Sequence, residues 1–479
     1  MQRIKILVLL LVSCFSRNSL FSQDSLPGII NLRQCVDIAI KHNLLVEQND
    51  LTMQSAGINR NQAIANLLPT INASGNQGTY FGKSINPTTY AYINQQQNTG
   101  SYSLNAGLTL FSGLQLQNAI RQYQYAYAAS KMDLQQQKDN ITLNVLLAYL
   151  QVLSSQDLLA ISKQQADVDL KQVQRLDLQN NEGALLLLSN LYDLKGQYAG
   201  DLGNIVTATN NLETAKVGLF QLLNVPYQKD MQYERILLDL ESQDLESGSG
   251  AIYQTALSNL PSIKSVDLKI KSYQKAILVN KGQYYPVLSL YGSVNSNYSN
   301  LATNTVLGPT LPVTTSDYVT VNGNNYNVVS QEQSSTTSNV SFGDQFNNNR
   351  NTQIGISLQV PILNYLRVRN NVKQAKINLK NAEFVANNTR LALQQSVELA
   401  YQNMIAAYGQ YKSYIDQVAA YAESFRTTEI RFNEGVVNSD VYVIAKNNID
   451  RANTNLSQSK YIYILRTKVL DYYRGKLTY

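Results

Sequence analysis

Four stretches of the chain alternate between apolar and polar residues with a period of two. They lie at about 70–82, 100–111, 286–298 and 351–363. In the last of them, one face carries Ile354, Ile356 and Leu358, and the other carries Gln353 and Ser357. This alternation predicts strands with one apolar face. Each stretch has the ~10 residues with which a tilted strand crosses a bilayer, although a soluble hairpin with one buried face would show the same pattern.

Long helical segments with coiled-coil spacing follow each pair of predicted strands. The clearest seam of small and apolar residues steps alternately by three and four along Ala375, Leu379, Ala382, Ala386, Thr389, Leu393, Ser396, Ala400, Asn403 and Ala407. Similar seams begin at Ile120 and Ile449. Sustained spacing of this kind predicts coiled-coil packing. A helix over 113–180 would be roughly 100 Å long at 1.5 Å per residue, enough to span a compartment.

Prolines mark where helix gives way to strand. A helical pattern over 31–66 ends before Pro69, and Pro286 stands at the matching place in the second half. Proline cannot continue a helix, and it pushes the preceding residue toward extended geometry. We therefore predict a helix-to-strand transition at both positions.

The two halves of the chain repeat one another. Ala39-Ile40 recurs as Ala256-Leu257 at an offset of 217 residues, and 181–183 recurs as 433–435 at an offset of 252. The offset increases from 217 to 252 within the Asn/Ser/Thr-rich segment 299–350. We predict this segment to be a surface loop, like its shorter counterpart 75–100. The sequence thus predicts two structural repeats, 24–247 and 248–479. Each would hold a helix, two strands and a helical hairpin, with tips near 181–185 and 433–438.

The N-terminus has the pattern of a secretory signal peptide, predicted over 1–23. Arg3 and Lys5 precede a short apolar run. The leader could be processed in two ways. One is cleavage after Gln23, and the other is processing at a lipobox at 11–14 that would make Cys14 a lipidated first residue. Both carry the protein out of the cytoplasm. No later run approaches 18 apolar residues, so a membrane crossing would need strands.

Composition argues against enzyme chemistry. Of 479 residues only 15% are charged, so neutral polar residues cover the surface. The single His42 and the two cysteines, Cys14 and Cys35, offer no His-based triad, His-ligated metal site or disulfide framework. The sequence shows no phosphate-binding loop or paired carboxylates. We therefore predict no enzyme, no cofactor and no metal. The net charge of +6 includes three leader residues and forms no patch for nucleic acid.

Four strands cannot form a closed barrel. An open sheet would expose unpaired edges to lipid, and small barrels need about eight strands. If the strands cross a membrane, copies of the chain must pool them. Two copies supply eight strands and a filled interior, and three supply twelve and a pore.

In the order of these features the chain resembles the TolC-like outer membrane efflux proteins. The resemblance covers about 31–475. It rests on the duplication, on Pro69 and Pro286, on Phe-Ser-Gly at 111–113, and on Val-Pro-Ile-Leu-Asn at 360–364. It implies a mostly α fold with a β-barrel part: a homotrimer with a twelve-stranded barrel in the outer membrane and a periplasmic α-helical tunnel. It also implies a periplasmic adaptor protein and an inner-membrane pump as partners.

The resemblance also implies candidate site residues at the two hairpin tips. Contact with the adaptor would fall on Asn181, Glu182, Gly183, Ala184, Asn433, Glu434, Gly435 and Val436. Where many relatives carry Leu-Asp-Ala near the narrowest point, this chain has Val443-Ile444-Ala445. The candidate constriction is then either a ring of Asp440 carboxylates or an apolar ring of Ile444.

Three functions fit these predictions. The leading hypothesis is a passive exit duct for small toxic molecules delivered by a pump and an adaptor. The second is the outer membrane duct of a type I protein secretion system. The third is a secreted coiled-coil structural or adhesive protein whose hairpins lie in water.

Overall fold

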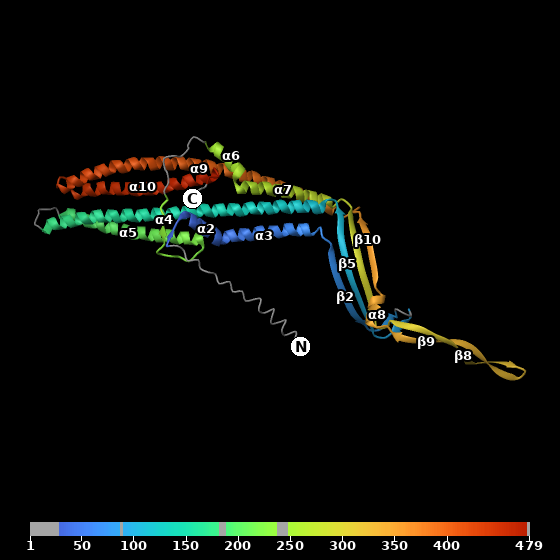
Figure 1. Ribbon diagram of the computed structural model, residues 1–479. Coiled ribbons are helices and arrows are strands. Elements are labelled where there is room, and N and C mark those ends of the chain that lie inside the picture. Colours follow the sequence, from blue (N-terminus) through green and yellow to red (C-terminus); the bar gives the residue numbers. More distant parts are fainter. Residues whose placement is uncertain (1–27, 87–89, 182–187, 237–247, 477–479) are drawn as a thin grey trace. The chain divides into compact units, whose positions relative to one another are not determined.

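The structure, a computed structural model, describes residues 28–86, 90–181, 188–236 and 248–476 (Figure 1). The predicted signal peptide, Cys14 and the tip residues Glu182, Gly183 and Ala184 lie outside the described residues. The helices are α2 (Leu32–His42), α3 (Leu44–Ala65), α4 (Gln115–Asn181), α5 (Leu188–Leu223), α6 (Ser249–Asn259), α7 (Pro261–Gly282), α8 (Phe342–Asn348), α9 (Arg367–Asn433) and α10 (Ser439–Tyr473). The strands are β1 (Ile29–Ile30), β2 (Thr70–Tyr80), β3 (Lys83–Ile85), β4 (Tyr92–Asn94), β5 (Gln97–Ser112), β6 (Gln232–Tyr233), β7 (Val287–Ser299), β8 (Thr303–Val321), β9 (Asn324–Asn339) and β10 (Asn351–Gln359).

The described residues group into two compact units. The helical unit takes its residues from Met1–Met53, Ser130–Ser265 and Asn387–Tyr479, and the sheet unit takes Gln54–Ala129 and Val266–Ala386. Each unit therefore combines segments from both sequence repeats. The duplication describes the order of elements along the chain, whereas packing joins elements across the two halves: β5 pairs with β7, and α5 contacts α10.

The prediction of one continuous helix over 31–66 is wrong, because the chain breaks at Asn43 between α2 and α3. Asn43 adopts extended angles, with φ −73° and ψ 122°. Its side chain donates to the Leu222 carbonyl at 3.1 Å and accepts from the Leu45 N–H at 3.0 Å. An asparagine that accepts from the second residue of the following helix is an N-cap. Asn43 thus ends α2 and starts α3.

Helices α4 and α9 have 67 residues each, as the long coiled-coil patterns predict. The predicted seam of α9 is wrong in detail after Leu393. The buried positions are Val397, Ala400, Met404 and Ala407, whereas Ser396 is exposed. A helix with 3.6 residues per turn drifts from a strict heptad, and the larger Val397 and Met404 side chains fill the core.

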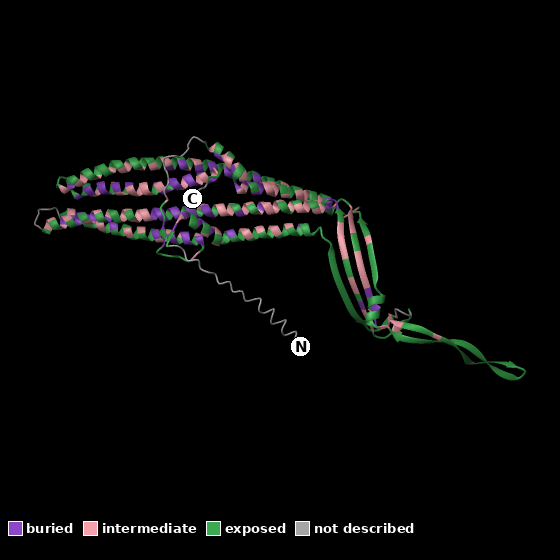
Figure 2. Cartoon of the chain, in the orientation of Figure 1, coloured by how far each residue is buried: buried purple, intermediate pink, exposed green. Residues whose placement is uncertain are grey.

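Three clusters of buried side chains hold the helical unit together (Figure 2). In the first, the Tyr149 hydroxyl donates to the carbonyls of Ile30 and Glu234 at 3.1 and 2.7 Å. This places the α4 core beside the short β1–β6 pair. Cys35 is fully buried in the same cluster, as a small core residue. The second cluster holds Tyr463, whose ring packs against Tyr408 and Tyr411 of α9.

One part of α4 differs from the expectation about apolar runs. Helix α4 contains an 18-residue window with a mean hydropathy of 1.4, which meets the length and composition of a membrane span. The first core cluster takes seven residues from Ile141 to Leu153 of this helix. Core helices of globular proteins meet the same test, so we interpret this segment as packing against other helices.

The sheet unit is built on four antiparallel strands in the order β10-β7-β5-β2. These correspond to the four stretches with alternating residues, although β10 stops at Gln359 and β5 starts at Gln97. A register shift lies between Thr109 and Phe111 in β5. Phe111 therefore pairs with Leu288 on the apolar side, where strict alternation from Leu108 would place Leu110. A bulge that adds one residue explains the exchange of faces.

The prediction that 75–100 and 299–350 are loops is wrong. In the first half, β2 and β5 extend through much of the segment, and β3 and β4 form a short pair within it. In the second half, β8 and β9 form a long hairpin that is followed by α8. Asn, Ser and Thr resemble turn residues in composition. Here they alternate with Val, Leu and Tyr along strands that carry no buried face to mark them.

Gly113 is a position where only glycine fits. Its φ is +62°, and an added Cβ would lie 2.4 Å from the Gly282 carbonyl oxygen. We predict that Gly113→Ala lowers the free energy of unfolding by about 1–3 kcal/mol, because both the backbone angle and the contact are unfavourable. Gly203→Ala is the matched control: nothing lies within 4 Å of its added Cβ in α5. It should gain about 0.5–1 kcal/mol. Thermal unfolding in detergent, followed by circular dichroism, checks both, and equal midpoints for the two variants would contradict the account.

Candidate channel wall and helical tips

One face of the four-stranded sheet is apolar from edge to edge. The register places Ile71, Ala106, Gly292 and Ile354 in one row, and Leu108, Leu290 and Ile356 in the next. Ile354 is 78% exposed and Ile71 is 66% exposed. A contiguous apolar surface of this extent marks contact with another protein or with a membrane.

The opposite face is polar and neutral. Asn72, Asn105, Ser293 and Gln353 form one row across all four strands. In the next row, the Ser74 and Ser103 hydroxyls lie 2.7 Å apart, and Asn105 donates to Ser103 at 3.1 Å. Hydroxyl and amide groups can exchange hydrogen bonds with water without attracting ions of one sign. This face has the chemistry of a wetted wall that discriminates little among solutes.

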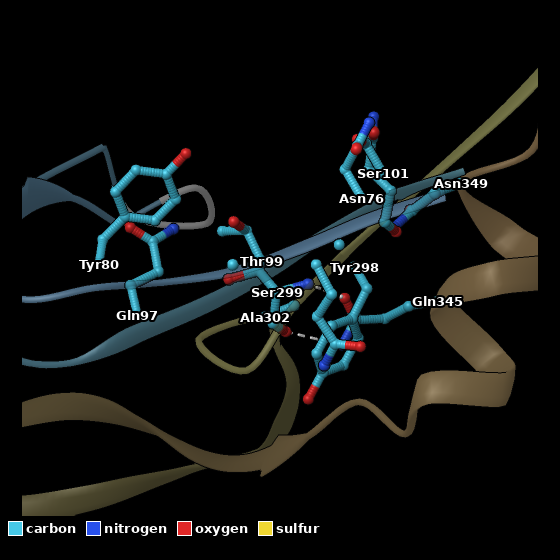
Figure 3. A pocket seen from close by; sticks show the side chains of 14 residues that line it. Asn76, Tyr80, Gln97, Thr99, Ser101, Tyr298, Ser299, Ala302, Gln345 and Asn349 are labelled. Atoms are coloured by element: carbon cyan, nitrogen blue, oxygen red, sulfur yellow. Dashed lines mark hydrogen bonds between the residues drawn. The ribbon is translucent and has the colours of Figure 1, made fainter. Parts of the chain in front are cut away.

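Helix α8 packs against the end of the sheet that is remote from its connections to α7 and α9. Gln345 holds it there: its amide donates to the Ser299 and Val340 carbonyls, both at 2.9 Å, and its oxygen accepts from the Ser299 N–H at 2.9 Å. A cleft of about 630 Å³ beside it is lined by amide, hydroxyl and tyrosine side chains, including Asn76, Tyr80 and Gln97 (Figure 3).

Aromatic side chains of this end divide into two groups. Tyr102 packs edge-on against Phe342 and Phe346 of α8, with ring centroids 5.8 Å apart in both pairs. Four further aromatic residues remain more than 60% exposed, namely Tyr80, Phe81, Tyr90 and Tyr92. Exposed aromatic rings at one end of membrane strands are typical of an interface belt.

The second hairpin turns through a left-handed glycine. Gly435 has φ +76°, its N–H donates to the Phe432 carbonyl at 3.0 Å, and the Val436 N–H donates to the Arg431 carbonyl at 2.8 Å. This pair of bonds is the Schellman motif, in which glycine ends a helix. Glu434, Gly435 and Val436 are exposed on the turn.

The two hairpins are joined just below this turn. Arg175 of α4 donates to the side chain and the backbone carbonyl of Asn433. The Ser439 hydroxyl contacts Asn190 at 2.9 Å and Asp193 at 2.8 Å, both in α5. The Phe432 and Tyr442 rings stack at 4.8 Å within the third core cluster. The described residues of the tip region thus form one packed body.

A buried cluster of charges connects the same helices further along. Lys446 of α10 lies 3.2 Å from Asp169 in α4, 3.4 Å from Asp201 in α5, and 2.6 Å from Asp450 in its own helix. The Lys446 and Asp169 side chains are 2% and 0% exposed. A buried charge without a partner is costly, but Lys446 contacts three carboxylates and stays paired when one of them is lost.

The charges of this cluster alter its protonation. Burial raises the pKa of Asp169 to about 7; Lys446 opposes this rise, and Asp201 adds to it. Burial lowers the pKa of Lys446, but its hydrogen bond to Asp450 and the other carboxylates reverse this, so the net pKa is raised and the ammonium is retained. Lys446 and Asp450 also line a cleft of about 740 Å³.

The predicted site residues are brought together only in part. Asn433 lies in the junction between hairpins, and Asn181 is the exposed last residue of α4. Asp440 is exposed in the first turn of α10, and Ile444, one turn further on, is 62% exposed. Residues four apart on a helix share a face. Both constriction candidates therefore stand on one exposed side.

The sequence reasoning missed the buried charge cluster. A signal was present in the seam that begins at Ile449. Continued toward the N-terminus by steps of three and four, it passes through Lys446 and Tyr442, which are 1% and 0% exposed. A lysine at a seam position predicts buried acidic partners on the facing helices, as Asp169 and Asp201 prove to be.

Comparison with known proteins identifies the family. The family model described as outer membrane efflux protein matches residues 35–225 and 252–467, so the chain belongs to that family. "Toxin and drug export protein A" of Aggregatibacter actinomycetemcomitans is 22% identical over 90% of this chain and 83% of its own. "Outer membrane protein TolC" of Salmonella enteritidis is 23% identical over 79% and 70%. The crystal structure of the Campylobacter jejuni CmeC outer membrane channel superposes with a TM-score of 0.72 at 17% identity, covering 93% of this chain and 86% of that one.

Family membership confirms the resemblance, the fold class of long helical hairpins with membrane strands, and the location in the cell outer membrane with the helical part in the periplasm. The family is one of channels and not a class of enzymes. The hypothesis of a secreted coiled-coil structural or adhesive protein is therefore set aside.

We predict that Asp169→Asn stabilises the protein in a pH-dependent way. An aspartate whose pKa is raised on folding makes the folded state less stable as pH rises from about 4, its ordinary pKa, to about 7. Removing that carboxylate should raise the thermal unfolding midpoint at pH 8 and have little effect at pH 4. The control, Asp167→Asn, removes an exposed carboxylate paired with Lys171, and its effect should not grow with pH. An Asp169→Asn gain that is equal at both pH values would contradict the assignment.

Proposed function

We propose that this protein is the outer membrane duct of a tripartite efflux system, a passive homotrimeric exit for small toxic molecules. One observation carries the proposal: a four-stranded antiparallel sheet with an apolar face, a neutral polar face and outer edges at β2 and β10 that pair with no other described strand. In lipid every backbone donor and acceptor needs a partner within the protein. A second copy must therefore cover each edge.

Three copies fit the two faces better than two. Eight pooled strands would enclose an interior filled by side chains, whereas twelve leave a pore. The inner face would then be the polar one. Its small Ser and Asn side chains suit a water-filled pore better than a packed core. The apolar face with Ile71 and Ile354 would face lipid. The relative named as a toxin and drug export protein supports small toxic molecules as cargo.

The partners would be a periplasmic adaptor protein and an inner-membrane pump. We assign adaptor contact to the hairpin tips, at Asn181, Glu182, Gly183, Ala184, Asn433, Glu434, Gly435 and Val436. The described members of this set lie at helix ends, and Val436 is 65% exposed. An exposed apolar residue on a rigid glycine turn suits docking of a partner. We expect no enzymatic activity, cofactor or resident metal, in keeping with a channel.

A second candidate cargo is a secreted polypeptide, handled by a type I secretion system. The word toxin in the name of the same relative favours it. The two functions differ in what accumulates when the duct is missing. Deleting the gene should make cells several-fold more sensitive to lipophilic drugs and dyes, and the wild-type gene should restore resistance. Unchanged drug sensitivity together with loss of a polypeptide from the medium would overturn small-molecule efflux in favour of protein secretion.

The two constriction candidates make different predictions for conductance. If a ring of Ile444 closes the duct by dewetting, Ile444→Ser should raise single-channel conductance in planar bilayers several-fold. If a ring of Asp440 closes it, Asp440→Asn should instead abolish block by divalent cations. Val441→Ala, on a neighbouring exposed position of α10, is the control and should change neither property. Wild-type conductance in both variants would remove both residues from the constriction.

A further inference from the structure

The two faces of the β8–β9 hairpin differ in composition. Pairing of Val319 with Tyr326, Val313 with Ser330 and Leu311 with Glu332 places these residues on one face. The apolar members of that face form a stripe of seven residues: Val306, Leu311, Val313, Val319, Val321, Tyr326 and Val328. The opposite face is mainly Thr, Asn and Gln, with Leu307, Tyr318 and Val329 among them.

This stripe is uncovered in the single chain. Its members are between 38% and 61% exposed, and all of β9 is exposed (Figure 2). A two-stranded hairpin without a packed face is at best marginally stable in water. A stripe of seven large apolar residues on such a hairpin therefore indicates that something covers it.

The charges of the segment exclude several occupants. Between 299 and 349 the chain has no lysine or arginine, and its acidic residues are Asp317, Glu332 and Asp344. Anionic lipid headgroups, phosphates and nucleic acids are bound through basic residues. A largely apolar surface without basic residues suits another surface of the same composition.

The backbone edges of the hairpin differ from one another. Strand β8 contains Pro309 and Pro312 and is irregular twice, between Leu307 and Thr310 and between Thr314 and Tyr318. Prolines and bulges are devices by which proteins block pairing at an edge. With the β8 edge blocked, head-to-tail pairing of the strands of neighbouring hairpins is disfavoured. Contact through the apolar stripe remains.

The position of the hairpin in the topology indicates which molecule covers the apolar stripe. The hairpin connects β7 to β10, and β10 is an edge strand of the four-stranded sheet. It leaves the sheet at the end remote from α7 and α9, and since the helices are periplasmic this end is external. In a trimer three hairpins would rise at the same end of one barrel, beside the junctions between copies. Tethering gives such neighbours effective concentrations of about 1 mM.

We propose that the three β8–β9 hairpins of one trimer pack their apolar stripes against each other outside the barrel and form a cap over its external mouth. This proposal rests on the trimeric duct of the preceding section. Packing would remove the stripe from water and leave the Thr/Asn/Gln face toward solvent. The cap gives the insertion in the second half of the chain a structural role.

Cysteine cross-linking tests the cap directly. Val319→Cys places a thiol on the stripe, and the adjacent Thr320→Cys places one on the opposite face. The native Cys35 is fully buried, and Cys14→Ser removes the other native cysteine if the leader is retained. With a short bis-maleimide on intact outer membranes, Val319→Cys should yield cross-linked chains at least tenfold more efficiently than Thr320→Cys. Equal yields, or products only with a different protein, would overturn the cap.

A second measurement separates this proposal from the trimer itself. Native mass spectrometry of each preparation counts subunits before cross-linking. A trimer without stripe-specific cross-links overturns the cap alone, whereas a different subunit count overturns the duct on which it rests. Proteolysis on intact cells adds a functional readout: chymotrypsin should cut the Val313→Asn/Val319→Asn hairpin at Tyr318 or Tyr326 at least tenfold faster than the wild-type one. The control, Thr310→Asn/Thr320→Asn, alters the polar face and should be cut at the wild-type rate.

Discussion

The unpaired outer edges of β2 and β10 are the constraint from which the rest of the structure follows. Within the bilayer there is no water to satisfy backbone donors and acceptors, so an open sheet of four strands is not a possible end state. Copies of the chain must complete it. Once they do, the alternation along each strand separates a lipid-facing surface at Ile354 and Ile71 from a hydrogen-bonding one at Asn72 and Asn105. The neutral polar wall has few fixed contacts with which to select a solute, which suits a passive duct.

The long helices must stay packed against one another along their whole length. Small and polar seam residues let them approach closely but contribute little apolar area. Specific interactions supplement them near the tips: Arg175 binds Asn433, Ser439 contacts Asp193, and Lys446 lies among three carboxylates. Each joins α4 or α5 to α9 or α10.

The sequence predicted what periodicity and proline determine. The four strands and the two 67-residue helices follow from spacings of two and of three or four, and Pro69 and Pro286 mark the transitions. It failed where a side chain acts alone or where composition misleads. Asn43 breaks a helix through two hydrogen bonds, one to the neighbouring Leu45 and one to Leu222, which lies far along the chain. The β8–β9 hairpin has a turn-like composition, and the register of Phe111 depends on a bulge that no alternation shows. At the tips, a turn at Gly435 was predictable because glycine adopts left-handed angles freely. The partners of Lys446 could be named only once the facing helices were known.

The most direct measurement is the number of subunits in the protein extracted from outer membranes, by native mass spectrometry without prior cross-linking. The account predicts a trimer in the membrane fraction, because only pooled strands can pair the edges of β2 and β10. A folded monomer in the outer membrane would contradict it, since that sheet would then face lipid with its edges open. A dimer would also contradict it, because eight strands would leave the polar face in a filled interior without a pore.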